Sequence, residues 1–463
     1  MGLGKVYDFV VLGSGPSGRR SAIQAAKLGK KVLVVENRNP GGVSVHTGTI
    51  PSKTVRETVL NLTGFRERNF YANVVYPAAE EDLYGRVKAT QEREVEVLRD
   101  QFVRNNVELV TGSAKFLNPN MVEITREGGV RETVEAQKFV IAVGTNCYRP
   151  GDLQFDGRFV CDSDQFLSLN HIPKSVVVIG AGVIGVEYAS ILNVLGRDVT
   201  LVDPRENYLE FIDREIIAEF TSILRTRGVS FRLGRKLTDI ISANEDGVRV
   251  ALDNGEVLET GMVLYAAGRV GATSDLGLEN CGLSADSRGR ITVNKDTFQT
   301  KKTNIYAVGD VVGFPALAST SMAQGRIAAC HAFGEKIFKP SEYYPYGIYS
   351  VPEISTCGMS QTDAEKLGID FIVGSAKFAE TSRGQIMGMD CGFLKLIFSQ
   401  EKRELIGVHI IGEGASELIH IGQAVLRFGG GVDYFVENIF NFPTLAEAYK
   451  VAALNAWNKL RTT

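Results

Sequence analysis

The sequence predicts an α/β fold in which the same βαβ unit occurs twice. Both segments, 7–36 and 175–203, read as an apolar strand, a GxGxxG turn, a helical stretch and a second strand that ends in an acidic residue. A lone GxGxxG is a weak signal, but the full arrangement is typical of a Rossmann-like dinucleotide-binding unit. A chain of 463 residues is also too long for one compact core, so two to four domains are expected.

The first unit, residues 7–36, places its glycines where a dinucleotide needs them. Gly13 permits the tight turn, Gly15 lets the main chain approach a pyrophosphate, and Gly18 lets the helix pack on the strand. The amino end of the helix offers free N–H groups and a positive dipole to the phosphates. Glu36 is expected to accept both hydroxyls of an adenosine ribose. The alternative is a glycine-rich turn without a ligand.

The second unit, residues 175–203, repeats this pattern with Gly180, Gly182, Gly185 and a terminal Asp203. Two such units in one chain indicate two dinucleotides that meet face to face, which is an arrangement for hydride transfer. The glycine spacing alone does not say which dinucleotide each unit binds.

Composition excludes several classes of protein. The net charge of −3 does not indicate a nucleic-acid surface, and no apolar run approaches the roughly 20 residues of a membrane span. A strand begins within a few residues of Met1 and no signal peptide fits, so a cytoplasmic location is expected. The six cysteines and five histidines are scattered, and no metal site is expected.

Two further segments carry a resemblance to a known family. Residues 41–53 read GGVSVHTGTIPSK, and residues 303–310 read TNIYAVGD. They are similar to segments of the flavoprotein pyridine nucleotide-disulfide oxidoreductases, and the resemblance extends over essentially all 463 residues. It implies that the first unit binds FAD, that the second binds NAD or NADP, and that Asp310 binds a ribityl hydroxyl of the flavin.

The same segment lacks the redox disulfide of that family. The family pattern GGxCxxxxCIPSK has two cysteines, and Ser44 and Thr49 stand at those positions here. The family also has an acid–base histidine in HPTxxE near the carboxyl terminus, where this chain has Phe442 and keeps Glu447. A phenylalanine cannot transfer a proton. The chain therefore lacks the groups that thiol chemistry requires.

This pattern of losses resembles the soluble pyridine nucleotide transhydrogenases. The matching strings are GTIPSK at 48–53, GVIGVEYAS at 182–190, GIYSVPEIS at 347–355 and FNFPTLAEAY at 440–449. The resemblance implies FAD-dependent hydride transfer from NADPH to NAD⁺ by a ping-pong route through flavin N5, without a disulfide. The chain departs from that family at Ser44, where a cysteine is expected.

The family plan also implies the domain organisation. FAD-binding residues are expected at 1–155 and 276–345, with the NAD(P) domain at 156–275. Residues 346–463 are expected to form an α+β dimerisation domain, and the protein to be a homodimer or a larger homo-oligomer. NAD(H) and NADP(H) are the expected substrates, with neither a nucleic acid nor a membrane as a partner.

The resemblance adds further cofactor-binding candidates around the glycine motifs. They are Gly42, Thr49, Gly144, Gly268 and Ala318. A helix that begins near Ala318 would direct its positive end at the flavin and stabilise negative charge there.

Two residues are the candidates for the chemistry. Lys53 lies in IPSK, where Pro51 is expected to start a helix, and its charge would favour reduced flavin. Glu187 matches a glutamate near the nicotinamide and is a possible ion partner for Lys53. The alternatives are a surface lysine and a surface acid on a helix.

Coenzyme preference is harder to read from the sequence. Asp203 favours the free ribose of NAD, whereas Arg205 could bind the 2′-phosphate of NADP. Alternatively, Arg205 is only part of a solvated loop.

Two rival functions remain open at this point. A diaphorase or NAD(P)H oxidase would need the same flavin site and no disulfide. A catalytically idle flavoprotein scaffold would need neither Lys53 nor Glu187.

Overall fold

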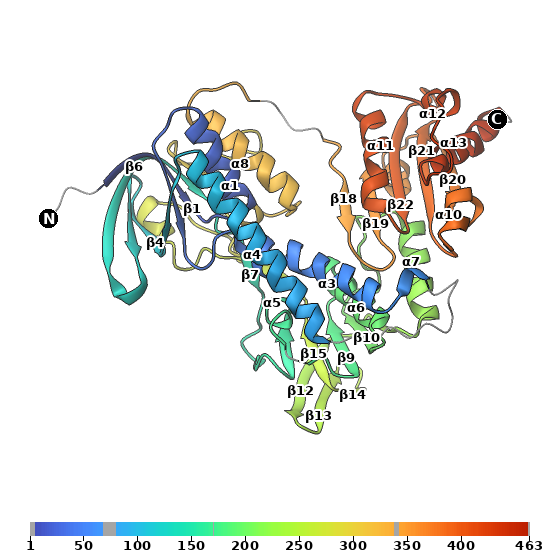
Figure 1. The fold of residues 1–463 in the computed structure, drawn as a ribbon, viewed down its shortest axis with the longest axis horizontal. Helices are drawn as coiled ribbons and strands as arrows, with labels where there is room; N and C mark the ends of the chain where they lie inside the picture. Colours follow the sequence, from blue (N-terminus) through green and yellow to red (C-terminus); the bar gives the residue numbers. More distant parts are fainter. Residues whose placement is uncertain (1–4, 68–79, 170, 338–341, 462–463) are drawn as a thin grey trace.

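The computed structural model describes residues 5–67, 80–169, 171–337 and 342–461 (Figure 1). Residues 1–4 and 462–463, the ends of the predicted first and last domains, lie outside this range. The strands of the described residues form three large sheets, a three-stranded sheet and a two-stranded ribbon.

The first sheet has seven strands and contains the first glycine motif. Its strands are β1 (Lys5–Leu12), β2 (Val32–Glu36), β3 (Glu108–Thr111), β4 (Ser113–Asn118), β5 (Met121–Thr125), β6 (Arg131–Ile141) and β17 (Ile305–Ala307). The order is β3-β2-β1-β6-β5-β4, and β17 pairs in parallel with β6. Because β17 follows the second large sheet in the chain, the chain returns to this sheet, as the family plan requires.

Both faces of the first sheet are covered. On one face, Phe9 and Val11 of β1 pack on α1 (Pro16–Lys27), α4 (Glu80–Arg104) and α8 (Ala318–Ala332). On the other face, Val10 and Leu12 pack with side chains of β4, β5 and β6. This alternation follows from the two-residue period of a strand. Figure 1 shows α1 and α8 side by side over the sheet.

The second sheet has five parallel strands in the order β11-β10-β9-β15-β8. They are β8 (Val160–Asp162), β9 (Ser175–Ile179), β10 (Asp198–Asp203), β11 (Ser230–Leu233) and β15 (Met262–Tyr265). Its helices are α5 (Ser163–Phe166), α6 (Val183–Val194) and α7 (Arg214–Thr226), and an antiparallel sheet of β12 (Leu237–Asn244), β13 (Gly247–Leu252) and β14 (Val257–Thr260) lies beside it. The ribbon of β7 (Thr145–Cys147) and β16 (Arg269–Gly271) connects it with the first sheet.

The third sheet is antiparallel, in the order β18-β19-β22-β21-β20. Its strands are β18 (Tyr346–Ile348), β19 (Ile354–Gly358), β20 (Phe371–Lys377), β21 (Phe393–Ser399) and β22 (Leu405–Ile411). The accompanying helices are α9 (Gln361–Lys366), α10 (Ser382–Ile386), α11 (Ala415–Arg427), α12 (Val432–Glu437) and α13 (Glu447–Leu460). In this sheet β19 pairs antiparallel with β22, from Ile354 opposite Ile411 to Gly358 opposite Gly407.

The helix that carries Lys53 packs against a helix of the second βαβ unit. After the short α2 (Gly42–His46), α3 (Thr49–Leu62) packs Val55 and Val59 against Ile191 of α6. The helix begins two residues before Pro51, so the expectation of Pro51 at the first helical position is wrong. Proline is tolerated at the third position because the first amides of a helix have no intrahelical acceptor.

The predicted fold class, α/β with two Rossmann-like units and a C-terminal α+β unit, is confirmed. The domain boundaries at residues 155, 275 and 345 stay predictions. None of the helices in the described residues has both the length and the apolar character of a membrane span.

A buried ion pair joins the second and third sheets. Lys395 of β21 and Asp213, the N-cap of α7, are both fully buried, and Lys395 Nζ lies 2.9 Å from Asp213 Oδ1. Lys395 Nζ also contacts Glu215 Oε2 at 3.0 Å and donates to Gln361 Oε1 at 2.9 Å. Removing one partner of such a pair leaves an uncompensated charge in the interior.

We predict that Lys395→Met lowers the free energy of unfolding by about 3–5 kcal/mol. Urea denaturation followed by the fluorescence of Trp457, the single tryptophan, measures the change. Lys402→Met, at an exposed position of the same antiparallel sheet region, is the matched control. Adding Asp213→Asn to Lys395→Met should recover part of the loss. If Lys395→Met alone were as stable as the Lys402→Met control, a structural role for the pair of Lys395 and Asp213 would be contradicted.

Candidate active site

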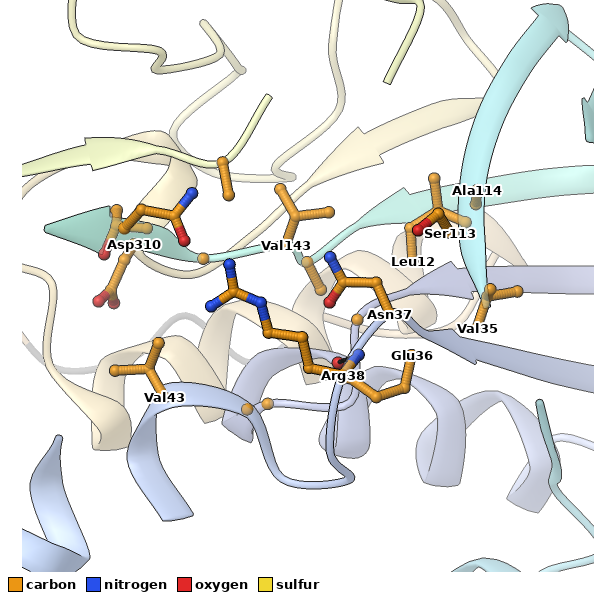
Figure 2. Close-up of a pocket in the computed structure, with 18 of the residues that line it drawn as sticks. Leu12, Val35, Glu36, Asn37, Arg38, Val43, Ser113, Ala114, Val143 and Asp310 are labelled. Carbon is orange, nitrogen blue, oxygen red and sulfur yellow. Dashed lines mark hydrogen bonds between the residues drawn. The ribbon is translucent and has the colours of Figure 1, made fainter. Parts of the chain in front are cut away.

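A cavity of about 610 Å³ lies at the carboxyl ends of the strands of the first sheet. Eight of the predicted cofactor residues line it: Gly13, Gly15, Glu36, Gly42, Thr49, Gly144, Asp310 and Ala318. Figure 2 shows Glu36 and Asp310 at separate places along this cavity. Parallel strands place residues from distant segments at a common edge, which explains why they meet.

The glycines of the first unit divide into structural and ligand-facing positions. A Cβ on Gly13 would lie 2.4 Å from the Ala142 carbonyl oxygen, and Gly13 has a φ of +101°. A Cβ on Gly18 would lie 2.0 Å from the Gly13 oxygen. At Gly15, by contrast, the nearest protein atom would be 4.0 Å away. Gly15 therefore leaves space for something other than the protein.

The second unit repeats this division. A Cβ on Gly180 would lie 2.7 Å from the Ala266 oxygen, and one on Gly185 would lie 1.7 Å from the Gly180 oxygen. A Cβ on Gly182 would meet no described atom within 4 Å. Gly182 has a φ of −76°, which any residue can adopt. Close packing thus explains Gly180 and Gly185, whereas no packing contact among the described residues requires a glycine at position 182.

Glu36 is buried and already oriented by the glycine loop. Its Oε2 accepts hydrogen bonds from Ser14 N at 2.9 Å and Ser14 Oγ at 2.6 Å. Its Oε1 accepts from Arg38 N at 3.0 Å. Ser14 and Arg38 were not predicted as site residues, although Arg38 also lines the cavity. Ser14 follows Gly13 directly and Arg38 stands two residues after Glu36, and these positions were the available signal.

Asp310 fits the role of an acceptor for a flavin hydroxyl. Among the described residues its side chain accepts one long hydrogen bond, from Ser321 Oγ to Asp310 Oδ1 at 3.4 Å. Burial raises the pKa of Asp310 above its ordinary value, against the opposing charge of Arg269. A half-buried carboxylate with spare acceptor capacity favours a ligand hydroxyl. The first turn of α8, from Ala318, lines the cavity beside it, and its N-cap Leu317 gives no side-chain cap.

Lys53 and Glu187 form an ion pair outside this cavity lining. Lys53 Nζ lies 2.7 Å from Glu187 Oε2, so the expected ion partner of Lys53 is present. Glu187 is almost completely buried, and its Oε1 accepts a hydrogen bond from Tyr349 N at 2.8 Å. The Tyr349 ring centroid is 5.0 Å from Lys53 Nζ. Tyr349 was not predicted as a site residue, although the string GIYSVPEIS contains it.

Asp203 and Arg205 contact each other directly. Arg205 Nε donates to Asp203 Oδ1, and Nη2 donates to Oδ2, both at 2.8 Å. Burial would raise the pKa of Asp203, but hydrogen bonds from Arg205 and the Ala181 amide outweigh burial and hold it below its ordinary value. Arg205 is thus part of an ion pair rather than a freely solvated side chain.

Gly268, another predicted cofactor residue, has a φ of +121°, and its carbonyl oxygen accepts a hydrogen bond from Tyr148 N between the two units.

Two family models together cover most of the chain. Residues 7–325 match pyridine nucleotide-disulphide oxidoreductase, and residues 344–453 match the dimerisation domain of the same family. The chain belongs to this family. Its membership makes the protein an oxidoreductase with FAD as cofactor and nicotinamide nucleotides as substrates. The resemblance read from GTIPSK and TNIYAVGD is confirmed.

Relatives within the family match over almost the full length. A soluble pyridine nucleotide transhydrogenase of Mycobacterium bovis is 47% identical over 464 residues, covering 98% of both chains. One from Enterobacter sp. is 40% identical over 461 residues, again covering 98% of both chains. LpdA from Mycobacterium tuberculosis has a similar structure, with a TM-score of 0.89 at 25% identity over 96% of this chain and 99% of that chain. The HOCl-induced flavoprotein disulfide reductase RclA from Escherichia coli is also similar in structure, with a TM-score of 0.87 at 26% identity. The match covers 97% of this chain and 99% of that chain.

We predict that Gly182→Val folds, keeps its FAD and loses affinity for NAD⁺ and NADP⁺ by roughly tenfold or more, because the new side chain occupies space that no described atom fills. Isothermal titration calorimetry on the yellow protein measures this. Gly151→Val is the matched control, because Gly151 is also free of close contacts but lies outside both glycine motifs. Unchanged nucleotide affinity in Gly182→Val would remove Gly182 from the site.

Proposed function

We propose that this protein transfers hydride between NADPH and NAD⁺ with FAD as the carrier. The observation that carries the proposal is the identity of two residues in the cavity. Ser44 and Thr49 both line it at the positions of the family disulfide. Neither hydroxyl can be oxidised to a disulfide or attack one, so electrons have no thiol acceptor there. A second nicotinamide nucleotide is the simplest remaining acceptor.

The carboxyl-terminal substitution supports the same conclusion. Phe442 is largely exposed and cannot act as an acid or a base. Glu447, which in the family orients the lost histidine, keeps a buried Oε2 for which the described residues offer no hydrogen-bond partner. The groups specific to thiol chemistry are thus absent or unused. The names of the relatives from Mycobacterium bovis and Enterobacter sp. support the transhydrogenase assignment.

The residues of the first unit are suited to hold FAD. Gly13 and Gly15 leave the helix amides free for the pyrophosphate, Glu36 accepts from the ribose, and Asp310 accepts from the ribityl chain. When bound, FAD supplies N5, which accepts and donates hydride. Lys53 provides a positive charge whose position is set by Glu187 and the Tyr349 ring. Such fixed charges stabilise charge that develops during the reaction.

The second unit is the predicted site for both nicotinamide nucleotides. Gly182 leaves space for a pyrophosphate, and the pair of Asp203 and Arg205 lies where the adenosine ribose is expected. Since donor and acceptor share this site in the proposal, they bind in turn. The protein contributes positioning, because NADPH and NADH carry almost the same reducing power.

The assembly and location are also part of the proposal. Residues 344–453 match a dimerisation domain, and Phe428, Ile439 and Phe442 expose most of their apolar surface there. Exposed apolar side chains of this size favour a subunit interface, so we propose a homodimer or a larger homo-oligomer. The relatives named soluble transhydrogenases support a cytoplasmic location.

We predict that initial rates of NADPH oxidation, plotted in double-reciprocal form at several fixed NAD⁺ concentrations, give parallel lines. The reason is that the two nucleotides alternate in one site. High concentrations of either nucleotide should inhibit. Intersecting lines would show a ternary complex and contradict a shared site. Rapid oxidation of NADH with quinone or oxygen, without nucleotide exchange, would favour a diaphorase or oxidase instead.

We predict that the protein does not reduce lipoamide or glutathione disulfide, because Ser44 and Thr49 offer no thiol. Anaerobic dithionite titration should therefore take up two electrons per FAD, without a thiol–flavin charge-transfer band. Cys147 and Cys391 are partly accessible, so a thiol-blocked sample serves as the control. Uptake of four electrons per FAD in both samples would reveal a second redox centre and contradict the proposal.

A further inference from the structure

The carboxylate at the end of β10 has all of its acceptor positions occupied by the protein. Asp203 Oδ1 accepts from Arg205 N at 2.9 Å and from Arg205 Nε at 2.8 Å. Asp203 Oδ2 accepts from Ala181 N at 2.6 Å and from Arg205 Nη2 at 2.8 Å. Asp203 is buried, whereas the Arg205 side chain is 56% exposed. Two of these four hydrogen bonds come from an arginine side chain that solvent can reach.

This arrangement has opposite consequences for the two nucleotides. An unmodified adenosine ribose presents hydroxyls that need a free carboxylate, so Arg205 must leave Asp203 before they can bind. A 2′-phosphate is repelled by a bare carboxylate, but the paired Arg205 neutralises Asp203 and has guanidinium hydrogens left to donate. The same arginine therefore obstructs one nucleotide and attracts the other.

The first unit has an acid and an arginine at the same spacing, but there the arginine side chain lies away from the acid. Glu36 and Arg38 have the same spacing as Asp203 and Arg205, and Arg38 N donates to Glu36 Oε1 at 3.0 Å. The Arg38 side chain nevertheless extends away from Glu36 into the cavity, as Figure 2 shows. The main-chain hydrogen bond is thus compatible with either position of the side chain.

A second carboxylate is available to the released Arg205. The hydrogen bonds to Asp203 raise the pKa of Arg205, and the charge of Glu210 adds to this effect. Glu210 belongs to the loop between β10 and α7 and is exposed. An arginine that leaves Asp203 therefore remains near a negative charge.

We propose that the Arg205 side chain has two positions and that the bound nucleotide decides which of them it takes. It stays on Asp203 when the 2′-phosphate of NADP(H) binds and leaves Asp203 when the ribose hydroxyls of NAD(H) bind. The inference rests on the proposed function and explains how one site serves both nucleotides. Its distinctive consequence is that Arg205 weakens NAD binding, although it belongs to the NAD site.

The test is calorimetric titration of the oxidised holoenzyme with NAD⁺ and NADP⁺, which avoids turnover. Arg205→Ala should bind NADP⁺ roughly tenfold or more weakly, because a charge-assisted contact is lost. It should bind NAD⁺ about two- to fivefold more tightly, because an ion pair no longer has to break. Adenosine 2′,5′-bisphosphate and 5′-AMP should show the same opposite shifts, which assigns them to the adenosine end.

Arg235→Ala is the matched control. Arg235 is an exposed arginine whose main-chain N lies 3.1 Å from the Asp203 carbonyl oxygen, but its side chain does not contact the Asp203 carboxylate. Removing it should not tighten NAD⁺ binding. Arg205→Lys should retain more NADP⁺ affinity than Arg205→Ala, since the charge remains without the two-pronged contact. FAD content and melting temperature should match the wild type in all three variants.

Two results would overturn the inference. One is unchanged or weaker NAD⁺ binding in Arg205→Ala with normal FAD content. The other is an equal gain in NAD⁺ affinity in Arg235→Ala, which would indicate a general charge effect. Either can occur while the wild type exchanges hydride between NADPH and NAD⁺, and then only the inference fails. A wild type that binds both nucleotides but exchanges no hydride would instead remove the proposed function.

Discussion

The ion pair of Lys53 and Glu187 is the contact on which the site depends. It joins α3, which follows the first glycine motif, to α6, which follows the second, at a distance of 2.7 Å. The other oxygen of Glu187 binds Tyr349 N, and Ser190 Oγ accepts from Val351 N nearby, so the carboxyl-terminal segment is held to the same helix. Three segments far apart in the sequence are thereby fixed in one geometry. Hydride transfer depends steeply on the distance and orientation of the reacting groups, so this rigidity is the main contribution that the chain can make.

The substitutions at Ser44, Thr49 and Phe442 leave that geometry intact. Ser44, in α2, and Thr49, the first residue of α3, remain on the cavity wall, and Phe442 lies on the exposed surface before α13. What is lost is the ability to pass electrons to sulfur and to protonate a thiolate. A family scaffold without these groups keeps both dinucleotide-binding βαβ units, β1–α1–β2 and β9–α6–β10. The proposed activity is therefore what remains of the family chemistry when its last step is removed.

The sequence predicted the parts of the structure that depend on local rules. The roles of Gly13, Gly18 and Gly185 follow from strand-to-helix turns, and the structure shows a main-chain oxygen where each Cβ would lie. Contacts between distant segments were beyond such rules. The buried pair of Lys395 and Asp213 joins residues 182 positions apart, and no local pattern announces it. The contact between Asp203 and Arg205 is local, but the sequence could not decide between the side-chain positions of an arginine in a loop.

The most direct test of the central claim is an anaerobic stopped-flow experiment in two steps. NADPH is mixed with the oxidised holoenzyme, the flavin absorbance is followed, and NAD⁺ is added after NADP⁺ has been removed. The account predicts rapid bleaching in the first step and, in the second, return of the yellow colour with one NADH formed for each FAD. Bleaching that NAD⁺ does not reverse, but that quinone or oxygen does, would contradict transfer between nucleotides.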